Sequence, residues 1–112
     1  MTDCLFCRIV SGEIPSERVA ETDAVVAFRD VDPKAPLHVL VVPRIHVADV
    51  GELADAEPAT VTELVQVARQ VVADSGQESY RLVFNTGEEA GQTVFHAHVH
   101  VLAGRPLSWP PG

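Results

Sequence analysis

The chain has 112 residues, 46% of them hydrophobic, which fits one folded domain over residues 1–112 and argues against global disorder. Its 16 acidic residues outnumber 8 Lys and Arg, and the net charge of −8 disfavours nucleic-acid and anionic-membrane partners. No apolar run approaches the ~20 residues of a membrane span and the start does not resemble a signal peptide, so we expect a cytoplasmic protein.

The first half of the chain is predicted to contain a short helix, a hairpin, a polar loop and a buried strand. Gly12 and Pro15 end the helix, Thr22-Asp23 forms the turn of the hairpin, and prolines keep the loop irregular. The strand after the loop is a compact run of branched apolar residues, which is typical of a central strand. In chain order these elements span residues 4–11, 18–21 with 24–28, 29–36 and 38–42.

The second half begins with the clearest helix of the sequence, over residues 58–75. Apolar residues recur there at helical spacing, Pro58 suits the first turn, and Gly76 suits the position after the end. We therefore expect an α+β domain, with a mostly antiparallel sheet of about five strands, this long helix on one face and a short N-terminal helix. The remaining segments are two strands, the loop between them and a proline-rich tail, at residues 80–84, 94–102, 86–93 and 104–112.

Three of the chain's five histidines alternate along the last predicted strand, at His96, His98 and His100. Because side chains alternate across a strand, these imidazoles share one face. A surface strand with chance histidines explains this poorly, since histidine is a nucleophile, an acid or base near neutral pH, and a metal ligand. The other face is expected to lie under the long helix, with Phe95, Ala97, Val99 and Val101.

This run resembles the histidine triad (HIT) signature, in which three histidines alternate with apolar residues and two apolar residues follow. Other segments resemble the same family along nearly the whole chain, and the tail resembles its nucleotide-binding (HINT) branch. The resemblance implies a HIT-like fold, a homodimer, and hydrolysis of purine nucleoside phosphoramidates or acyl-adenylates to nucleoside monophosphates. The segments are residues 4–7 with 14–15, 27–30, 36–43, 85 with 87, 91–94 and 109–112.

The resemblance assigns His98 as the nucleophile, which would form a nucleotidyl-histidine intermediate that water hydrolyses. Its second ring nitrogen would donate to a backbone carbonyl, for which we expect that of His96. His100 would donate to a phosphate oxygen and His38 would lie near the phosphate. Thr93 would pass a proton to the leaving group.

A nucleoside pocket without an organic cofactor is also implied by the resemblance. Ile14, Phe28 and Val31 would enclose the base, and Asp30 would accept from the ribose hydroxyls. Taken alone, Ile14 and Phe28 are more often simple core residues, and the glycine-containing loop is a plain connection. The residues implied to hold the sugar or phosphate are Asn85, Gly91, Gln92, Thr93, Val94, His98 and His100.

The pair Cys4 and Cys7 has a spacing that favours metal binding or redox chemistry in a reducing compartment. With His46 and His96 it would form a tetrahedral zinc site of two thiolates and two imidazoles, similar to that of some bacterial relatives. Such a zinc would be structural, pinning the N-terminal segment and leaving His98 free. Two reduced cysteines without metal are the alternative.

Two other functions remain open. One is a zinc-dependent hydrolase in which His96, His98 and His100 hold a catalytic metal, although this leaves the cysteines unexplained. The other is a non-catalytic module that uses the same pocket for nucleotide sensing or partner docking. In the homodimer that the resemblance implies, Trp109 either reaches toward the partner's active site or packs on its own subunit.

Overall fold

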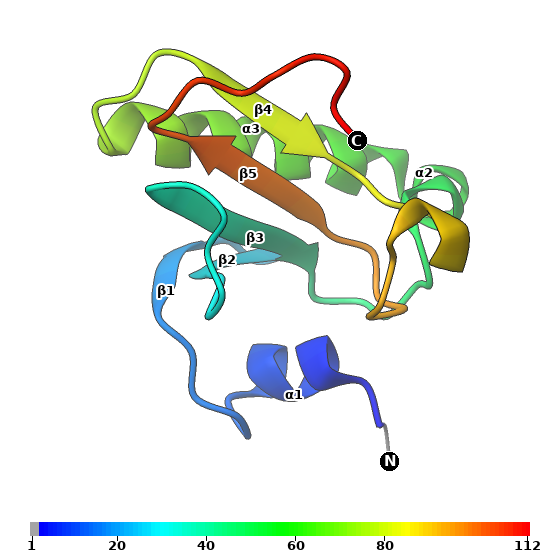
Figure 1. Cartoon of the computed structure of the whole chain (residues 1–112). Helices are drawn as coiled ribbons and strands as arrows, with labels where there is room; N and C mark the ends of the chain where they lie inside the picture. Colours follow the sequence, from blue (N-terminus) through cyan, green and yellow to red (C-terminus); the bar gives the residue numbers. More distant parts are fainter. Residues whose placement is uncertain (1–2) are drawn as a thin grey trace.

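A five-stranded antiparallel sheet, with strand order β1-β2-β3-β5-β4, divides the structure into two faces (Figure 1). The computed structural model describes residues 3–112 of the chain. The long helix α3 packs against one face, and the short helix α1 lies on the opposite side. The elements are α1 (Leu5–Ser11), β1 (Arg18–Glu21), β2 (Val25–Arg29), β3 (Leu37–Pro43), α2 (Val50–Ala56), α3 (Pro58–Asp74), β4 (Tyr80–Val83), η1 (Glu88–Ala90) and β5 (Val99–Ala103).

Strand β3 shows how the sequence builds both faces. All of its residues are buried, and successive side chains alternate between two apolar clusters. Val39 and Val41 join Leu64 of α3 in the larger cluster, where burial of each such side chain stabilises the fold by roughly 1.5–3 kcal/mol. Leu40 packs with Phe6 of α1 in the smaller cluster. The predicted α+β architecture is confirmed.

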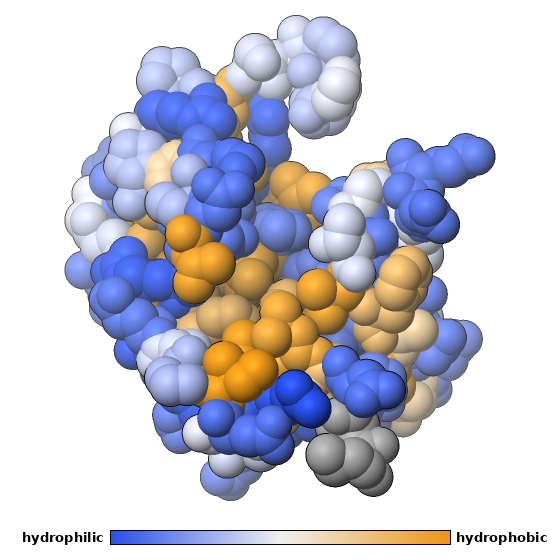
Figure 2. Space-filling model, turned by 60° about the horizontal axis from the view of Figure 1, so that its bottom comes forward, coloured by the Kyte–Doolittle hydropathy of each residue, from blue (hydrophilic) through white to orange (hydrophobic). Residues whose placement is uncertain are grey.

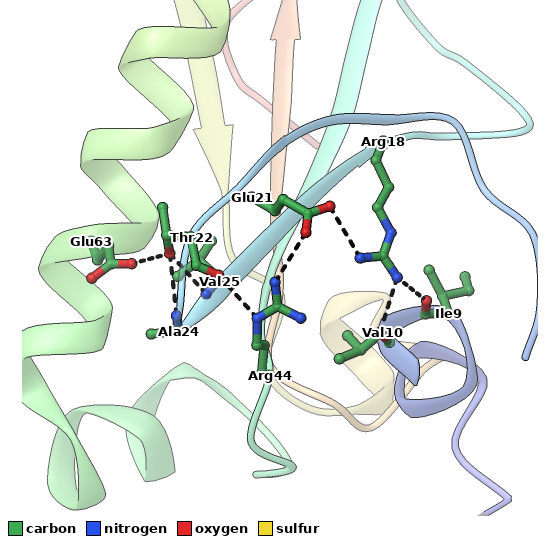
Figure 3. Close-up of polar contacts among 9 residues, drawn as sticks. All are labelled: Ile9, Val10, Arg18, Glu21, Thr22, Ala24, Val25, Arg44 and Glu63. Atoms are coloured by element: carbon green, nitrogen blue, oxygen red, sulfur yellow. Dashed lines mark hydrogen bonds and ion pairs between the residues drawn. The ribbon is translucent and has the colours of Figure 1, made fainter. Parts of the chain in front are cut away.

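Helix α1 is fastened to the sheet by side chains of the β1–β2 hairpin (Figure 3). It ends at Gly12, whose φ of 85° is the left-handed conformation that glycine adopts without strain. The Arg18 side chain donates to the carbonyls of Ile9 and Val10 at 2.7 and 2.9 Å, at the end of the helix, where the Ile9 carbonyl also accepts from the backbone N–H of Gly12. Glu21 accepts from Arg18, and this contact holds the arginine toward the helix.

Helix α2 was not expected from the sequence. Its N-cap Asp49 accepts from the backbone N–H of Glu52, and the Glu52 side chain accepts from the N–H of Ala48. An acidic residue three positions after Asp is a capping signal that could have been read from the sequence. Leu53 is fully buried and anchors the helix in the larger cluster. Within residues 3–112, no helix has the length and apolar character that crossing a membrane requires.

The last strand begins at Val99, five residues later than predicted. The preceding segment leaves the ladder: the N–H of Ala97 donates to the carbonyl of Val47, in the segment after β3. Ala97 still enters the core below α3, as expected, but Phe95 is 50% exposed. The prediction that Phe95 faces the core is therefore wrong, because the alternation of a strand does not extend to that residue.

Candidate functional site

A cavity of about 700 Å³ opens beside α1, within the range of small-molecule sites in proteins. Figure 2 shows that hydrophobic side chains gather around a hollow on this side of the molecule. One part of the lining is apolar and another part carries polar groups, an arrangement that suits a ligand with an apolar ring system and an anionic end. The lining includes Leu5, Phe6, Ile9, Ile14, Phe28, Asp30, Val31, Leu40, Asn85, Gly91, Thr93, Val94, His98 and His100.

Most of the residues predicted to bind a nucleotide therefore meet at one cavity, with two differences. Val31 is fully exposed at the rim, so it does not enclose a base as Ile14 and Phe28 could. Gln92 is buried and does not line the cavity: its amide donates to the carbonyls of Ala48 and Val94, and its oxygen accepts from the Gly87 N–H. Since its backbone N–H also donates to the Gly87 carbonyl, Gln92 holds the loop together and has no donor left for a phosphate.

His98 is a buried imidazole whose protonation is set by the backbone. Its Nδ1 lies 2.7 Å from the carbonyl oxygen of His96 and must donate to it, as expected from the sequence. Burial lowers the pKa of His98, so the ring is neutral near neutral pH and its Nε2 carries a lone pair. The ring of Phe6 packs edge-on against it, with centroids 4.9 Å apart. A neutral imidazole held in one tautomer beside a cavity can act as a nucleophile or as a base.

His100 belongs to a second cluster with His38 and Asp30. His38 Nε2 lies 2.9 Å from His100 Nδ1 and 3.4 Å from Asp30 Oδ2, and His38 Nδ1 accepts from the backbone N–H of Lys34 at 3.0 Å. Burial is the main cause that lowers the pKa of His100 to about 4, with contributions from His98 and His38. Burial also lowers the pKa of His38, against the opposing charge of Asp30. Both rings are therefore neutral near pH ~7.

The four residues predicted to bind zinc converge at the N-terminal end of α1. His96 Nδ1 lies 3.3 Å from Cys4 Sγ, 3.4 Å from Cys7 Sγ and 3.2 Å from His46 Nδ1. Ligands of a tetrahedral zinc, with bonds of roughly 2.0–2.3 Å, lie about 3.5 Å apart, so these separations fit the ion. His96 Nε2 donates to the carbonyl of Pro43 at 2.8 Å, which leaves the lone pair on Nδ1, the nitrogen that lies near the sulfur atoms of Cys4 and Cys7.

Sequence reasoning missed several residues of the site. Phe6 and Ile9 lie one helical turn apart in the predicted helix, and Leu40 lies two residues after His38 on the same side of its strand, so periodicity could have indicated all three. The backbone groups of Lys34 and Pro43 carry no sequence signal, because every residue has a carbonyl and nearly every residue has an N–H.

Comparisons with known proteins identify the family and the fold of this chain. Residues 11–107 match the HIT domain family. The chain is 45% identical over 111 residues to a HIT-like protein of Synechocystis sp., covering 98% of this chain and 97% of that protein. It is 42% identical to a 14 kDa zinc-binding protein of Zea mays, covering 96% and 87% of the two chains, and 37% identical to the purine nucleoside phosphoramidase of Escherichia coli, covering 94% and 90%. The structure is similar to that of a HIT family hydrolase from Legionella pneumophila, with a TM-score of 0.93, 40% identity and coverage of 98% and 100%.

Proposed function

The chain belongs to the HIT domain family, and we propose that it hydrolyses purine nucleoside phosphoramidates or acyl-adenylates to nucleoside monophosphates. The similarity to the purine nucleoside phosphoramidase of Escherichia coli supports this substrate class. The observation that carries the proposal is the neutral imidazole of His98, which lines a nucleotide-sized cavity and keeps one ring nitrogen unprotonated through its bond to the His96 carbonyl.

The reaction that these groups would perform has two displacements at phosphorus. His98 Nε2 forms a bond to the phosphorus as the P–N or P–O bond to the amine or carboxylate leaving group breaks. The Thr93 hydroxyl passes a proton from solvent water to an amine leaving group, donating its own proton as it accepts another. Water then attacks the nucleotidyl-histidine, releases the nucleoside monophosphate and restores the imidazole.

Binding of an anionic substrate by a chain with a net charge of −8 requires local donors. His100, Asn85 and Thr93 all line the cavity and would supply such groups, with Gly91 in the loop between Asn85 and Thr93. Asp30, whose carboxylate lies within 4.8 Å of a ring nitrogen of His100, would accept from the two ribose hydroxyls, while Phe28 would contact the base.

The experiment that tests the proposal is turnover of a panel of adenosine and guanosine phosphoramidates. We expect His98→Ala to lose nearly all turnover and still bind AMP, and mass spectrometry of the quenched wild-type protein to find a nucleotide on His98. Thr93→Val should slow release of amines, whereas the matched change Thr86→Val, in the same loop but outside the cavity lining, should not. Unchanged turnover by His98→Ala contradicts the mechanism, and AMP binding without any product favours a sensing module.

We further propose a structural zinc held by Cys4, Cys7, His46 and His96. The similarity to the zinc-binding protein of Zea mays and the convergence of the four donor atoms support it. Zinc would tie α1, which carries Phe6, to the segments that carry the two histidines. The expected result of elemental analysis is about one zinc per chain in protein purified without chelator.

A catalytic zinc held by His96, His98 and His100 is less well supported by the donor positions. Among residues 3–112, the histidines whose ligand atoms converge with other donors within 4.8 Å are His46 with His96 and His38 with His100, in two separate groups. Full turnover by protein verified to be free of metal would exclude a catalytic zinc, whereas loss of chemistry with intact folding would favour it.

We also propose that the chain works as a cytoplasmic homodimer. Strand β4 is an edge of the sheet, and Trp109 in the tail is 83% exposed, so both could contact a second copy. Sedimentation equilibrium should give twice the mass of the chain, and a monomer at micromolar concentration would contradict the proposal.

A further inference from the structure

Two histidine clusters of this structure differ in the backbone group that each one contacts. In the proposed zinc site, Nε2 of His96 lies against the carbonyl oxygen of Pro43. In the cluster of Asp30, His38 and His100, Nδ1 of His38 lies 3.0 Å from the backbone nitrogen of Lys34 and faces its N–H. A carbonyl can only accept a hydrogen bond and a backbone N–H can only donate one, so these contacts determine where each ring carries its proton.

The Lys34 contact determines the protonation of two rings in succession. Because the N–H of Lys34 donates to His38 Nδ1, that nitrogen keeps its lone pair and the proton of the neutral ring lies on Nε2. His38 Nε2 is closer to His100 Nδ1, at 2.9 Å, than to Asp30, at 3.4 Å, and it donates to His100. His100 Nδ1 is then the acceptor, so the proton of the neutral His100 ring lies on Nε2.

We propose that the backbone N–H of Lys34 is a positioning group that holds His100 as an Nε2–H donor through His38, and that it closes the Asp30–His38–His100 cluster to divalent cations. The use of this donor toward an anionic phosphate oxygen rests on the proposed function, whereas the proton positions and the exclusion of metal do not. His100 lines the large cavity beside His98, whose bond to the His96 carbonyl gives it the opposite tautomer. The cavity is therefore lined by one ring with an accepting nitrogen, His98 Nε2, and one ring with a donating nitrogen, His100 Nε2–H.

Proximity alone would make this cluster a metal site. The ligand atoms of Asp30, His38 and His100 lie within 4.8 Å of one another, as do those of the proposed zinc site. A cation at His38 Nε2 would have to remove the proton from that nitrogen while Nδ1 still accepts from Lys34, which leaves an imidazolate. His96 can bind a cation as a neutral ring, because its Nε2 carries the proton and donates to the Pro43 carbonyl while Nδ1 keeps a lone pair.

Nuclear magnetic resonance of ¹⁵N-labelled protein tests the proton positions without any substrate. Long-range correlations distinguish a protonated from an unprotonated ring nitrogen, and we expect Nε2–H for His38 and His100 and Nδ1–H for His98. Lys34→Pro removes the N–H and should mix the tautomers of His38 and His100, while Lys34→Ala keeps the N–H and should give the wild-type ring signals. A wild-type spectrum with Nδ1–H on His38 or His100 overturns the inference, whether or not the proline variant folds.

A second pair of variants tests the same point at the next residue. His38→Gln retains an amide N–H that can donate to His100, and we expect it to preserve the Nε2–H form of His100. His38→Leu has no donor at this position, and we expect a mixture of both neutral tautomers of His100 in that variant. If both variants keep the Nε2–H signal of His100, or if both lose it equally, His38 does not position His100.

Addition of a metal ion and measurement of turnover distinguish this inference from the proposed function. Mn²⁺ added to the zinc-loaded protein should leave the ring signals of His38 and His100 unbroadened, and selective broadening of both overturns the exclusion of cations. With a phosphoramidate substrate, Lys34→Pro should lower kcat roughly ten- to hundredfold with little change in KM, as expected for a lost donor to developing charge. If no phosphoramidate is turned over but the tautomers are as stated, the proposed function fails and the positioning of His100 stands.

Discussion

His100 should make the free energy of unfolding depend on pH below neutrality. Its surroundings in the folded chain, chiefly burial, lower its pKa to about 4, whereas a histidine in the unfolded chain titrates near ~6.5. Between these values the unfolded chain binds a proton that the folded chain does not, so acid favours unfolding. The stabilisation is fully present above pH ~6.5 and is lost as the pH falls toward about 4.

The magnitude follows from the distance between the solution pH and the unfolded pKa. At about pH 5 this distance is about 1.5 units, and each unit corresponds to about 1.4 kcal/mol, which sets an upper value of roughly 2 kcal/mol. The ring is only partly buried and solvent screens its interactions. We therefore expect a loss of about 1 kcal/mol between about pH 7 and about pH 5 from this residue.

Urea unfolding of the wild type and of His100→Asn, followed by far-UV circular dichroism, measures this term. The four residues of the proposed zinc site are common to both proteins, so the difference in unfolding free energy reports His100 together with its hydrogen-bonded neighbour His38. We expect that difference to shrink by about 1 kcal/mol as the pH falls from about 7 to about 5. Val83→Ala changes the residue opposite His100 on β4, has no titrating group, and should show a difference independent of pH. A constant difference for His100→Asn would refute the reasoning.

Three further changes probe the zinc site, the cavity and the anchoring of α1. Cys7→Ser should purify with almost no zinc and a lower Tm, and a full zinc content would remove Cys7 from the site. Phe28→Ala should raise KM about tenfold or more with little change in kcat, because this buried ring lines the cavity, whereas exposed Phe95→Ala should leave KM unchanged. Arg18→Met should cost about 1–3 kcal/mol of unfolding free energy and speed amide exchange in α1, since the Ile9 and Val10 carbonyls at the helix end both lose a charged donor and Ile9 keeps only the N–H of Gly12; wild-type exchange there would contradict this.

Much of the architecture follows from side-chain pattern alone. The branched apolar run before Pro43 predicted the central strand, and the helical period after Pro58 predicted α3, because burial of one face dictates each period. The spacing of the three histidines placed His98 and His100 on one side of the sheet, where both line the cavity. The pattern could not show that regular pairing begins only at Val99, since the path of the preceding residues depends on the contact between Ala97 and Val47.

The sequence by itself therefore determined the fold class and predicted most of the polar side chains that line the cavity. Only the tertiary structure decided how those side chains are protonated and which are occupied elsewhere. The Gln92 side chain is hydrogen-bonded to backbone groups, His96 faces the carbonyl of Pro43, and His38 faces the N–H of Lys34. The physical reason is that the decisive partners are backbone groups, which are alike at almost every residue and acquire a role only when the packed chain brings them to a particular ring.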